Sequence, residues 1–349
     1  LRRARIFERI FFGNILFLFI FLFAISIFLI FLIGIELTAV FIVVSQLIAV
    51  IFSDKLIGTM SDWRISAENP AVHILQYHLP EKELESFRTK YTQEKLLQMK
   101  KEIYDRTLAL GKDINCETSR EVLLNHGFEC TPENMATKTV DVYQLVENAA
   151  EIYGLPTPKI IISNTMLPNA AASRPSPKRG VMLITTGLLV QLEEDEILSV
   201  IGHEFGHLKG RDPLILFALT SSQYLFQVYV LGYLWPALFD FPFFWFYFLF
   251  IMGVIYFIAK FFEARADLES AVHVGQPQVL AEALRKIGFR RLQLERVQAN
   301  KVQEWLGWDP HPPIYFRIGR LEKLQTPVKV RQTLVQSIKD VINGFLAAF

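Results

Sequence analysis

Long apolar segments occur in two parts of the chain. The first covers residues 10–52 and is interrupted only by a few small or polar residues. A single helix of this length would measure about 60 Å, roughly twice the hydrocarbon thickness of a bilayer. The pattern therefore predicts two membrane-spanning helices, near 11–33 and 37–53, with a turn at 34–36. The run is too long for a cleaved signal peptide.

The second apolar block covers residues 214–262 and is divided near Asp240. It predicts spans near 214–235 and 243–261, because each half is close to bilayer length and apolar on every face. A helix of a soluble core would instead keep a polar face. Aromatic residues typical of membrane interfaces lie near the divide, namely Tyr233, Trp235 and Trp245. We therefore expect about four transmembrane helices.

The segment between the two apolar blocks begins with a charged, mostly helical pattern over residues 54–140. Three helices are expected there. One begins after Pro80, a second covers 92–110, and a third starts at a capping box at 118–121 and ends before Gly127. The charges of this segment are expected on the solvated faces of these helices.

The pattern then changes to one that mixes strands and helices. Two short β-branched segments, 159–163 and 180–186, predict strands of a small sheet. The helices expected around them and towards the C-terminus cover 139–153, 276–292 and 315–324. The tail 330–345 has an apolar side and could either pack on the domain or lie on the membrane.

Basic residues beside the apolar segments indicate the topology. The turn at 34–36 and the divide at 236–242 carry no Lys or Arg, so one side of the membrane lacks basic flanks. The basic residues near the other ends of the spans are Arg2, Arg3, Arg5, Arg9, Lys55, Arg64, Lys209, Arg211, Lys260 and Arg265. We therefore expect both termini and the polar domain on the cytoplasmic side of a cell (inner or plasma) membrane.

Composition restricts the other partners. Hydrophobic residues make up 52% of the chain and the net charge is +1. The sequence lacks a basic, aromatic-interleaved patch suited to nucleic acid, and it lacks a phosphate-binding loop. Cys116 and Cys130 fall on the predicted cytoplasmic side, so we expect free thiols and no disulfide. The chain begins with Leu1, which leaves the position of its natural N-terminus open.

The most specific chemical signal is an HExxH motif that begins at His203. Two histidines four apart on a helix project from one face, because a turn takes about 3.6 residues. His203 and His207 can therefore bind one Zn²⁺, and Glu204 can reach a water on that ion. Such a pair makes a hydrolase, since the ion lowers the pKa of the water and the carboxylate moves the proton.

The flanks of the motif predict a half-buried helix. Acidic residues at 193–196 suit the positive end of a helix dipole. Lys209 lies in the expected last turn, and Gly210 is the expected stop. The apolar residues that recur at helical spacing are Ile197, Leu198, Ile201, Phe205 and Leu208.

A catalytic zinc site needs a third protein ligand and one open position. Glu263 follows an apolar segment and opens what looks like a helix on the water side, which makes it the best candidate. On position alone, a solvated surface charge is an equal alternative. Four other histidines have no partner at ligand spacing and are expected to be surface or structural residues; they are His73, His78, His126 and His273.

With these motifs in view, the chain resembles the HtpX family of membrane zinc metalloproteases, which belongs with the CAAX prenyl endopeptidases and the mitochondrial Oma proteases. The resemblance covers most of the chain. It rests on paired N-terminal spans, the Pro-Asn-Ala segment at 168–170, the Thr-Thr-Gly at 185–187, HExxH, Glu-x-x-x-Asp at 263–267 and a late His-Pro-Pro at 311–313.

The resemblance implies one Zn²⁺ held by His203, His207 and Glu263, with Glu204 as general base and acid. It also implies that Asp267, which does not itself bind the ion, orients a ligand histidine. The residues that match the family's oxyanion-binding pair are His311 and Arg317. The residues that match its substrate-binding edge strand are Asn169, Ala170 and Ala171.

Together these observations predict a multi-pass α-helical membrane protein with a cytosolic α+β zincin-like (gluzincin) metalloprotease domain. The expected parts are an N-terminal transmembrane hairpin at 1–53, a helical insertion at 54–138, a protease core at 139–213, a second transmembrane hairpin at 214–262 and the rest of the core at 263–349.

The expected function is zinc-dependent hydrolysis of peptide bonds on the cytoplasmic side. The resemblance implies misfolded or membrane proteins as substrates, in protein quality control, and assembly into a homo-oligomer is left open. Two features depart from the family. The insertion at 64–138 is longer than in its simplest members and could gate the site, select substrates or mediate assembly. Ala171 stands where a bulkier aromatic residue is common.

Three alternatives remain. An intramembrane protease of the site-two type also uses HExxH, but the charges on both sides of this motif favour access to water. A protease of prenylated C-termini would need a large lipid-lined chamber, which four spans are too few to enclose. A non-catalytic membrane scaffold or assembly factor would be expected to have lost part of the set formed by HExxH, Glu263 and His311.

Overall fold

The computed structural model describes most of the chain. The described residues are Ile25, 28–79, Phe87, 90–131, 133–176, 178–239, 243–297, 301–307 and 309–349. Most of the first predicted span, the start of the helix expected after Pro80, and the divide at Asp240 lie outside the described residues.

A four-stranded sheet lies at the centre of the polar domain, with strand order β1-β4-β6-β5. Its strands are β1 (Trp63–Ile65), β4 (Lys159–Ser163), β5 (Ala170–Ser176) and β6 (Arg179–Thr185). The predictions of strands at 159–163 and 180–186 are confirmed. Strand β4 pairs in parallel with β6, whereas β1 pairs antiparallel with β4 and β5 antiparallel with β6. Strand β5 therefore forms one edge of the sheet.

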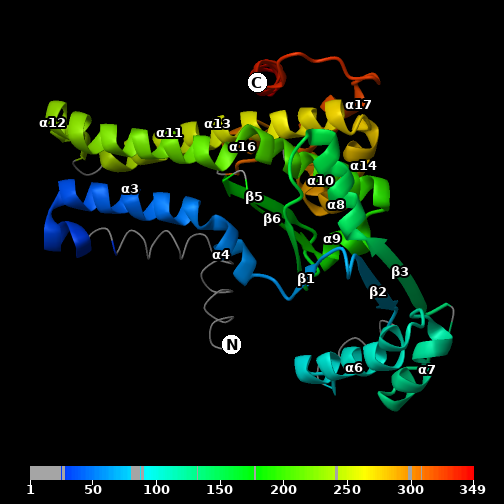
Figure 1. Ribbon diagram of the computed structural model, residues 1–349. Helices are drawn as coiled ribbons and strands as arrows, with labels where there is room; N and C mark the ends of the chain where they lie inside the picture. Colours follow the sequence, from blue (N-terminus) through cyan, green and yellow to red (C-terminus); the bar gives the residue numbers. More distant parts are fainter. Residues whose placement is uncertain are drawn as a thin grey trace.

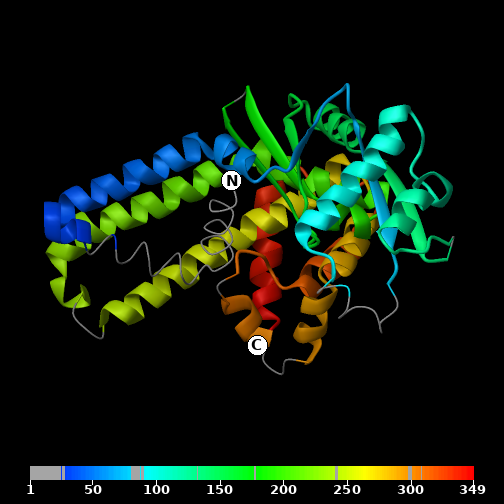
Figure 2. The same cartoon turned by 90° about the horizontal axis from the view of Figure 1, so that it is seen from below.

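The helix that carries HExxH packs between this sheet and several other helices. It is α10 (Glu194–Gly210), and it contacts α8 (Val142–Tyr153), α13 (Phe243–His273), α14 (Pro277–Ile287) and β5. Its apolar residues Ile197, Ile201 and Phe205 are fully buried, as the helical spacing predicts. The short helix α9 (Thr186–Gln191) connects β6 to α10. Figures 1 and 2 show α10 enclosed at the centre of the domain.

The apolar helices extend together from one side of the domain (Figure 1). Two of them, Asp212–Leu234 and Phe246–His273, are long and apolar enough to cross a membrane. The first consists of α11 (Asp212–Phe226), a π-helical segment (Gln227–Leu231) and α12 (Gly232–Leu234), followed by a 3₁₀ turn (Pro236–Phe239). A third candidate is bent by 66° between α3 (Ile35–Ile51) and α4 (Ser53–Thr59).

The long helix α13 corrects one expectation about the chain. Glu263 was expected to open a new helix after the last apolar segment. Instead α13 continues without a break from Phe243 to His273, through Glu263. A single rigid helix therefore leads from the apolar region into the core of the domain.

The segment expected to be a helical insertion also contains strands. Strand β2 (Ala71–Tyr77) pairs antiparallel with β3 (Met135–Asp141) in a separate two-stranded sheet. The expectation of a helix over 139–153 was wrong at its start, because residues 139–141 belong to β3. The Asp141 side chain accepts a hydrogen bond from the Gln144 backbone N–H at 2.8 Å and so caps α8 at Val142.

The helices of this insertion pack on the two-stranded sheet. They are α6 (Gln93–Arg106), a 3₁₀ turn (Leu108–Leu110) and α7 (Cys116–Asn125). Helix α6 agrees with the predicted helix over 92–110. The capping box of α7 lies earlier than expected, since Asn115 is the N-cap and Thr118 is its reciprocal partner. In Figure 1 the insertion lies at the opposite end of the molecule from the apolar helices.

Cys116 and Cys130 form a disulfide, so the expectation of free thiols was wrong. A hydrophobic cluster that includes Ile103, Leu123 and Phe128 brings the two cysteines together at the start of α7. Their Cα atoms lie 5.7 Å apart, within the range that a disulfide requires. The expectation rested on the predicted compartment and did not take account of this packing.

The C-terminal part of the chain is helical and returns to the core. Its helices are α14, α15 (Phe289–Val297), α16 (Lys301–Leu306), α17 (Ile314–Glu322) and α18 (Thr333–Leu346). The helix predicted over 276–292 is divided at Gly288, where a Cβ would overlap Ile314. Helix α18 packs against α13, with Val341 buried in a cluster that also holds Trp305. The tail thus packs on the domain.

The disulfide generates a prediction about stability. Replacing Cys116 by Ser should lower the free energy of unfolding by about 3 kcal/mol, because the bridge closes a loop with a sequence separation of 14. Thermal unfolding of the detergent-purified protein would measure this change. Parent and variant should unfold alike in excess dithiol. An equal difference with and without dithiol would assign the effect to packing of the Cys116 side chain instead.

Candidate metal centre and active site

Helix α10 presents the two motif histidines on one face. Its first turn is fixed by a capping box, in which the Glu196 side chain accepts from the Glu193 backbone N–H at 2.8 Å. Gly206 lies on the side that faces α13, and a Cβ there would lie only 3.0 Å from Ala266 Cα. The absence of a side chain at Gly206 lets α13 pack close to α10. This close packing brings Glu263 opposite the histidines.

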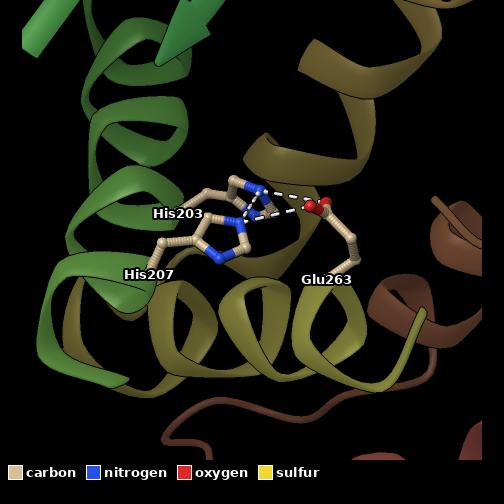
Figure 3. Close-up of side chains that lie close together, drawn as sticks. All are labelled: His203, His207 and Glu263. Atoms are coloured by element: carbon tan, nitrogen blue, oxygen red, sulfur yellow. Dashed lines mark hydrogen bonds and ion pairs between the residues drawn. The ribbon is translucent and has the colours of Figure 1, made fainter. Parts of the chain in front are cut away.

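Three candidate ligand atoms converge at this contact (Figure 3). His203 Nε2 and His207 Nε2 lie 3.1 Å apart. The two carboxylate oxygens of Glu263 each lie 3.5 Å from one of these nitrogens. Within the part of the chain that the structure describes, no other three His, Cys, Asp or Glu side chains bring their ligand atoms close enough together to hold a metal ion.

The distances fit a zinc ion. Ligands at zinc's usual bond lengths form the corners of a tetrahedron with edges of about 3.3 Å. The observed separations of 3.1 and 3.5 Å lie on either side of that value, with the two nitrogens facing different oxygens of Glu263. The Glu263 Oε2 atom is buried and has no hydrogen-bond partner among the described residues. A cation between these atoms would satisfy it.

The buried carboxylate of Asp267 lies beside Nδ1 of His203, the ring nitrogen that does not face the candidate metal position. His203 Nδ1 lies 2.9 Å from Asp267 Oδ1, and the Arg317 guanidinium donates two hydrogen bonds to Asp267, at 2.8 and 2.7 Å. Burial lowers the pKa of His203, but the carboxylates of Asp267 and Glu263 raise it to about 10.

Glu204 projects from α10 towards the edge strand of the sheet. Burial raises the pKa of the Glu204 carboxyl, while His203, His207 and a hydrogen bond from the Ala172 backbone act in the opposite direction. A raised pKa suits a group that must both accept and donate a proton. Strand β5, which carries Ala172, therefore lies next to the candidate base.

The structure places His311 beside Glu263, and it places Arg317 beside Asp267. His311 Nε2 lies 3.5 Å from Glu263 Oε2, and its Nδ1 lies 2.8 Å from Asp309 Oδ1. The His311 side chain is 44% exposed, whereas that of Arg317 is 8% exposed and pairs with Asp267. Direct contact of Arg317 with an oxyanion stays a prediction, and its described contacts favour an indirect role.

The segment expected to bind substrate lies at the edge of the sheet. Ala170 and Ala171 belong to β5 and pair with β6, and Asn169 immediately precedes the strand. The Asn169 backbone N–H donates to Thr185 Oγ1 at 2.9 Å, which anchors the start of the strand. Within the described residues, β5 pairs with a strand on one side only.

Sequence reasoning assigned no role in the active site to two residues of this region. Asp212 Oδ2 lies 2.7 Å from His207 Nδ1, and the buried Lys260 donates to the backbone carbonyl of Asp309. The spacing of Asp212 from His207 gives no signal of this contact, because residues five apart do not share a helix face and α10 ends before Asp212. No local pattern indicates the contact of Lys260.

These features are the ones expected of a metalloprotease, and the chain was compared with known proteins. The model of peptidase family M48 matches residues 136–325, which is more than half of the chain. A protease HtpX homolog of Thermodesulfovibrio yellowstonii is 32% identical over 218 residues, covering 53% of this chain and 75% of the relative. A second HtpX homolog, of Moorella thermoacetica, is 32% identical over 227 residues, covering 55% and 74%.

Two further matches are more partial. A protease HtpX homolog of Thermococcus sibiricus is 47% identical over 75 residues, which cover 22% of this chain and 26% of the relative. The crystal structure of S. mikatae Ste24p has a TM-score of 0.38 and 17% identity, and the match covers 51% of this chain and 49% of that one.

The chain belongs to peptidase family M48. Its resemblance to the HtpX proteases is confirmed by the two matches that cover about three quarters of those relatives, and the protein is a protease with apolar helices suited to a membrane.

The pairing of Arg317 with Asp267 can be tested by substitution. Arg317→Ala should lower the free energy of unfolding by about 3–5 kcal/mol, because it leaves the buried Asp267 carboxylate without its cation. Denaturant unfolding of the metal-free protein would measure the loss, and Arg317→Lys should recover part of it. Unchanged stability with a lowered kcat would instead support direct contact with the oxyanion.

Proposed function

We propose that this protein is a membrane-bound zinc endopeptidase whose active site faces the cytoplasm. The observation that carries the proposal is the convergence of His203 Nε2, His207 Nε2 and Glu263 at tetrahedral spacing, beside the Glu204 carboxyl. A decayed site in a non-catalytic scaffold would have no reason to keep this geometry. The family match supports proteolysis as the activity.

In this proposal His203, His207 and Glu263 hold one Zn²⁺. The ion, when bound, supplies Lewis acidity that activates water and polarises the scissile carbonyl. Glu204 accepts the proton of the attacking water and delivers it to the leaving amine. Its raised pKa, caused chiefly by burial, supports this double role. Asp267 fixes the orientation of His203.

The tetrahedral oxyanion needs a donor on the side of the site away from Glu204. We assign that role to His311, whose Nε2 is near Glu263 and whose Nδ1 is held by Asp309. Arg317 supports the site through its pairing with Asp267.

The substrate backbone is proposed to pair with the outer edge of β5, along Asn169, Ala170 and Ala171. Such a strand would lie next to Glu204, since the Ala172 backbone reaches that carboxyl. Backbone pairing selects extended chains and says little about side chains. This supports misfolded or membrane proteins as substrates and a role in protein quality control.

The membrane arrangement is also a proposal. Four spans are proposed, with the insertion, the core and both termini on the cytoplasmic side, because the basic flanks all lie at those ends. The Cys116–Cys130 disulfide is an observation that favours the opposite side, since cytoplasmic thiols are mostly kept reduced outside hyperthermophiles. A homo-oligomer is compatible with either arrangement.

Chelation and one substitution test the chemistry. Glu204→Gln should lower kcat for cleavage of an unfolded model protein by about 10²–10⁴-fold, because the amide cannot take a proton. The variant should still bind zinc, and chelator should abolish cleavage by the parent. Glu194→Gln, at an exposed position of the same helix, is the matched control and should leave cleavage unchanged. Full activity of Glu204→Gln would refute the mechanism.

The topology can be tested with two cleavage sites for a specific external protease. One is inserted in the exposed loop after Gly111 and the other after Phe349. Both sites should be cut in inside-out vesicles and protected in right-side-out vesicles, if the domain is cytoplasmic. Cutting in right-side-out vesicles only would place the domain on the outer side, where a disulfide forms readily.

A further inference from the structure

A second buried carboxylate lies behind the other ligand histidine. Asp212 Oδ2 lies 2.7 Å from His207 Nδ1, and Arg265 Nη2 donates to the same oxygen at 2.6 Å. Asp212 is 2% exposed and Arg265 is 8% exposed. Arg265 also donates to the backbone carbonyl of Gly206 at 3.1 Å, one residue before His207.

The end of α10 leaves space for the Arg265 guanidinium. Gly210 faces Arg265, and a Cβ at that position would overlap the guanidinium. The next residue, Arg211, has a φ of 55°, so α10 ends there and the chain turns directly into α11. This sharp turn returns Asp212, the first residue of α11, to the side of His207.

Each ligand histidine has a buried aspartate beside its Nδ1 atom, and the contact of His207 is a hydrogen bond whereas that of His203 is an ion-pair contact. His203 contacts Asp267, which is bound by Arg317. His207 contacts Asp212, which is bound by Arg265. In both cases the carboxylate meets Nδ1 and leaves Nε2 directed at the shared ligand point (Figure 3). A carboxylate at Nδ1 selects the tautomer with a free Nε2 lone pair.

We infer that Asp212 and Arg265 are positioning residues that hold His207 in its metal-binding orientation. This inference rests on the proposed function, because it assumes that His203, His207 and Glu263 bind a metal ion. Arg265 neutralises a carboxylate that would otherwise be buried with only a neutral imidazole as partner. It lies two residues after Glu263 on α13, so this helix supplies one ligand and fixes the orientation of another.

The placement also connects the metal site to the membrane segment. Asp212 begins the apolar helix Asp212–Leu234, and Arg265 lies on the other apolar helix, Phe246–His273. A relative shift of these two helices would move Asp212 away from Arg265 or His207. The orientation of His207 thus depends on how the two apolar helices pack at the base of the domain.

The test is the zinc affinity of the full-length protein in detergent, measured by competition with a chromophoric chelator. Asp212→Asn and Arg265→Met should each weaken zinc binding by about 10–100-fold. Asp212→Glu should recover part of the affinity, because it keeps the charge. Asp340→Asn is the matched control, since Asp340 forms a similar pair with Arg320 at 2.7 Å but contacts no ligand histidine. It should bind zinc like the parent.

A spectroscopic readout separates positioning from general stability. The visible absorption of the Co²⁺-loaded protein reports the ligand geometry, and it should shift in Asp212→Asn but not in Asp340→Asn. Thermal unfolding of each metal-free variant gives the stability change separately. Parent-like zinc affinity and Co²⁺ spectrum in both Asp212→Asn and Arg265→Met would overturn the inference.

Failure of the proposed function would give a different result. If the parent itself bound no zinc, or if His203→Ala bound it as tightly as the parent, the three-ligand site would be wrong, and with it the inference. If the parent bound zinc and cleaved protein while the Asp212 and Arg265 variants bound zinc normally, only the inference would fail.

Discussion

The close packing of α10 against α13 is the contact on which the active site depends. Gly202, Gly206 and Gly210 recur every fourth residue on α10. A Cβ at Gly202 or Gly210 would overlap side chains of α13 or of the turn after it, and one at Gly206 would lie only 3.0 Å from Ala266 Cα. When two helices approach this closely, side chains of moderate length on one helix reach those on the other. His203 and His207 can then meet Glu263, with no long side chain needed to cross a gap.

The same contact makes the site part of the fold and not an addition to its surface. Both histidines are backed by buried aspartates, and each aspartate is paired with a buried arginine. Such buried pairs contribute little net stability compared with an apolar core, but the loss of one partner is costly. They hold the ligand atoms in one arrangement, which is what tight metal binding requires.

The insertion illustrates where local patterns fail. The periodicity of α6 is strong and predicts that helix well. Strand β3 has the sequence Met-Ala-Thr-Lys-Thr-Val-Asp, in which only Met135 and Val140 are buried. Its extended conformation comes from pairing with β2, which lies about sixty residues earlier, and a window of neighbours carries no information about that partner. The disulfide depends on the same kind of long-range packing.

The sequence was sufficient for the features that depend on neighbours along the chain. It predicted the HExxH helix, strands β4 and β6, and the apolar helices among the described residues, because spacing on a helix or strand decides which residues share a face. It predicted Glu263 only with the help of family resemblance. The continuous path of α13, the pairing of Arg317 with Asp267 and the position of Asp212 behind His207 depend on contacts between distant segments. Only the packed structure could decide these, since a side chain's partner across a helix interface is set by geometry that local sequence does not encode.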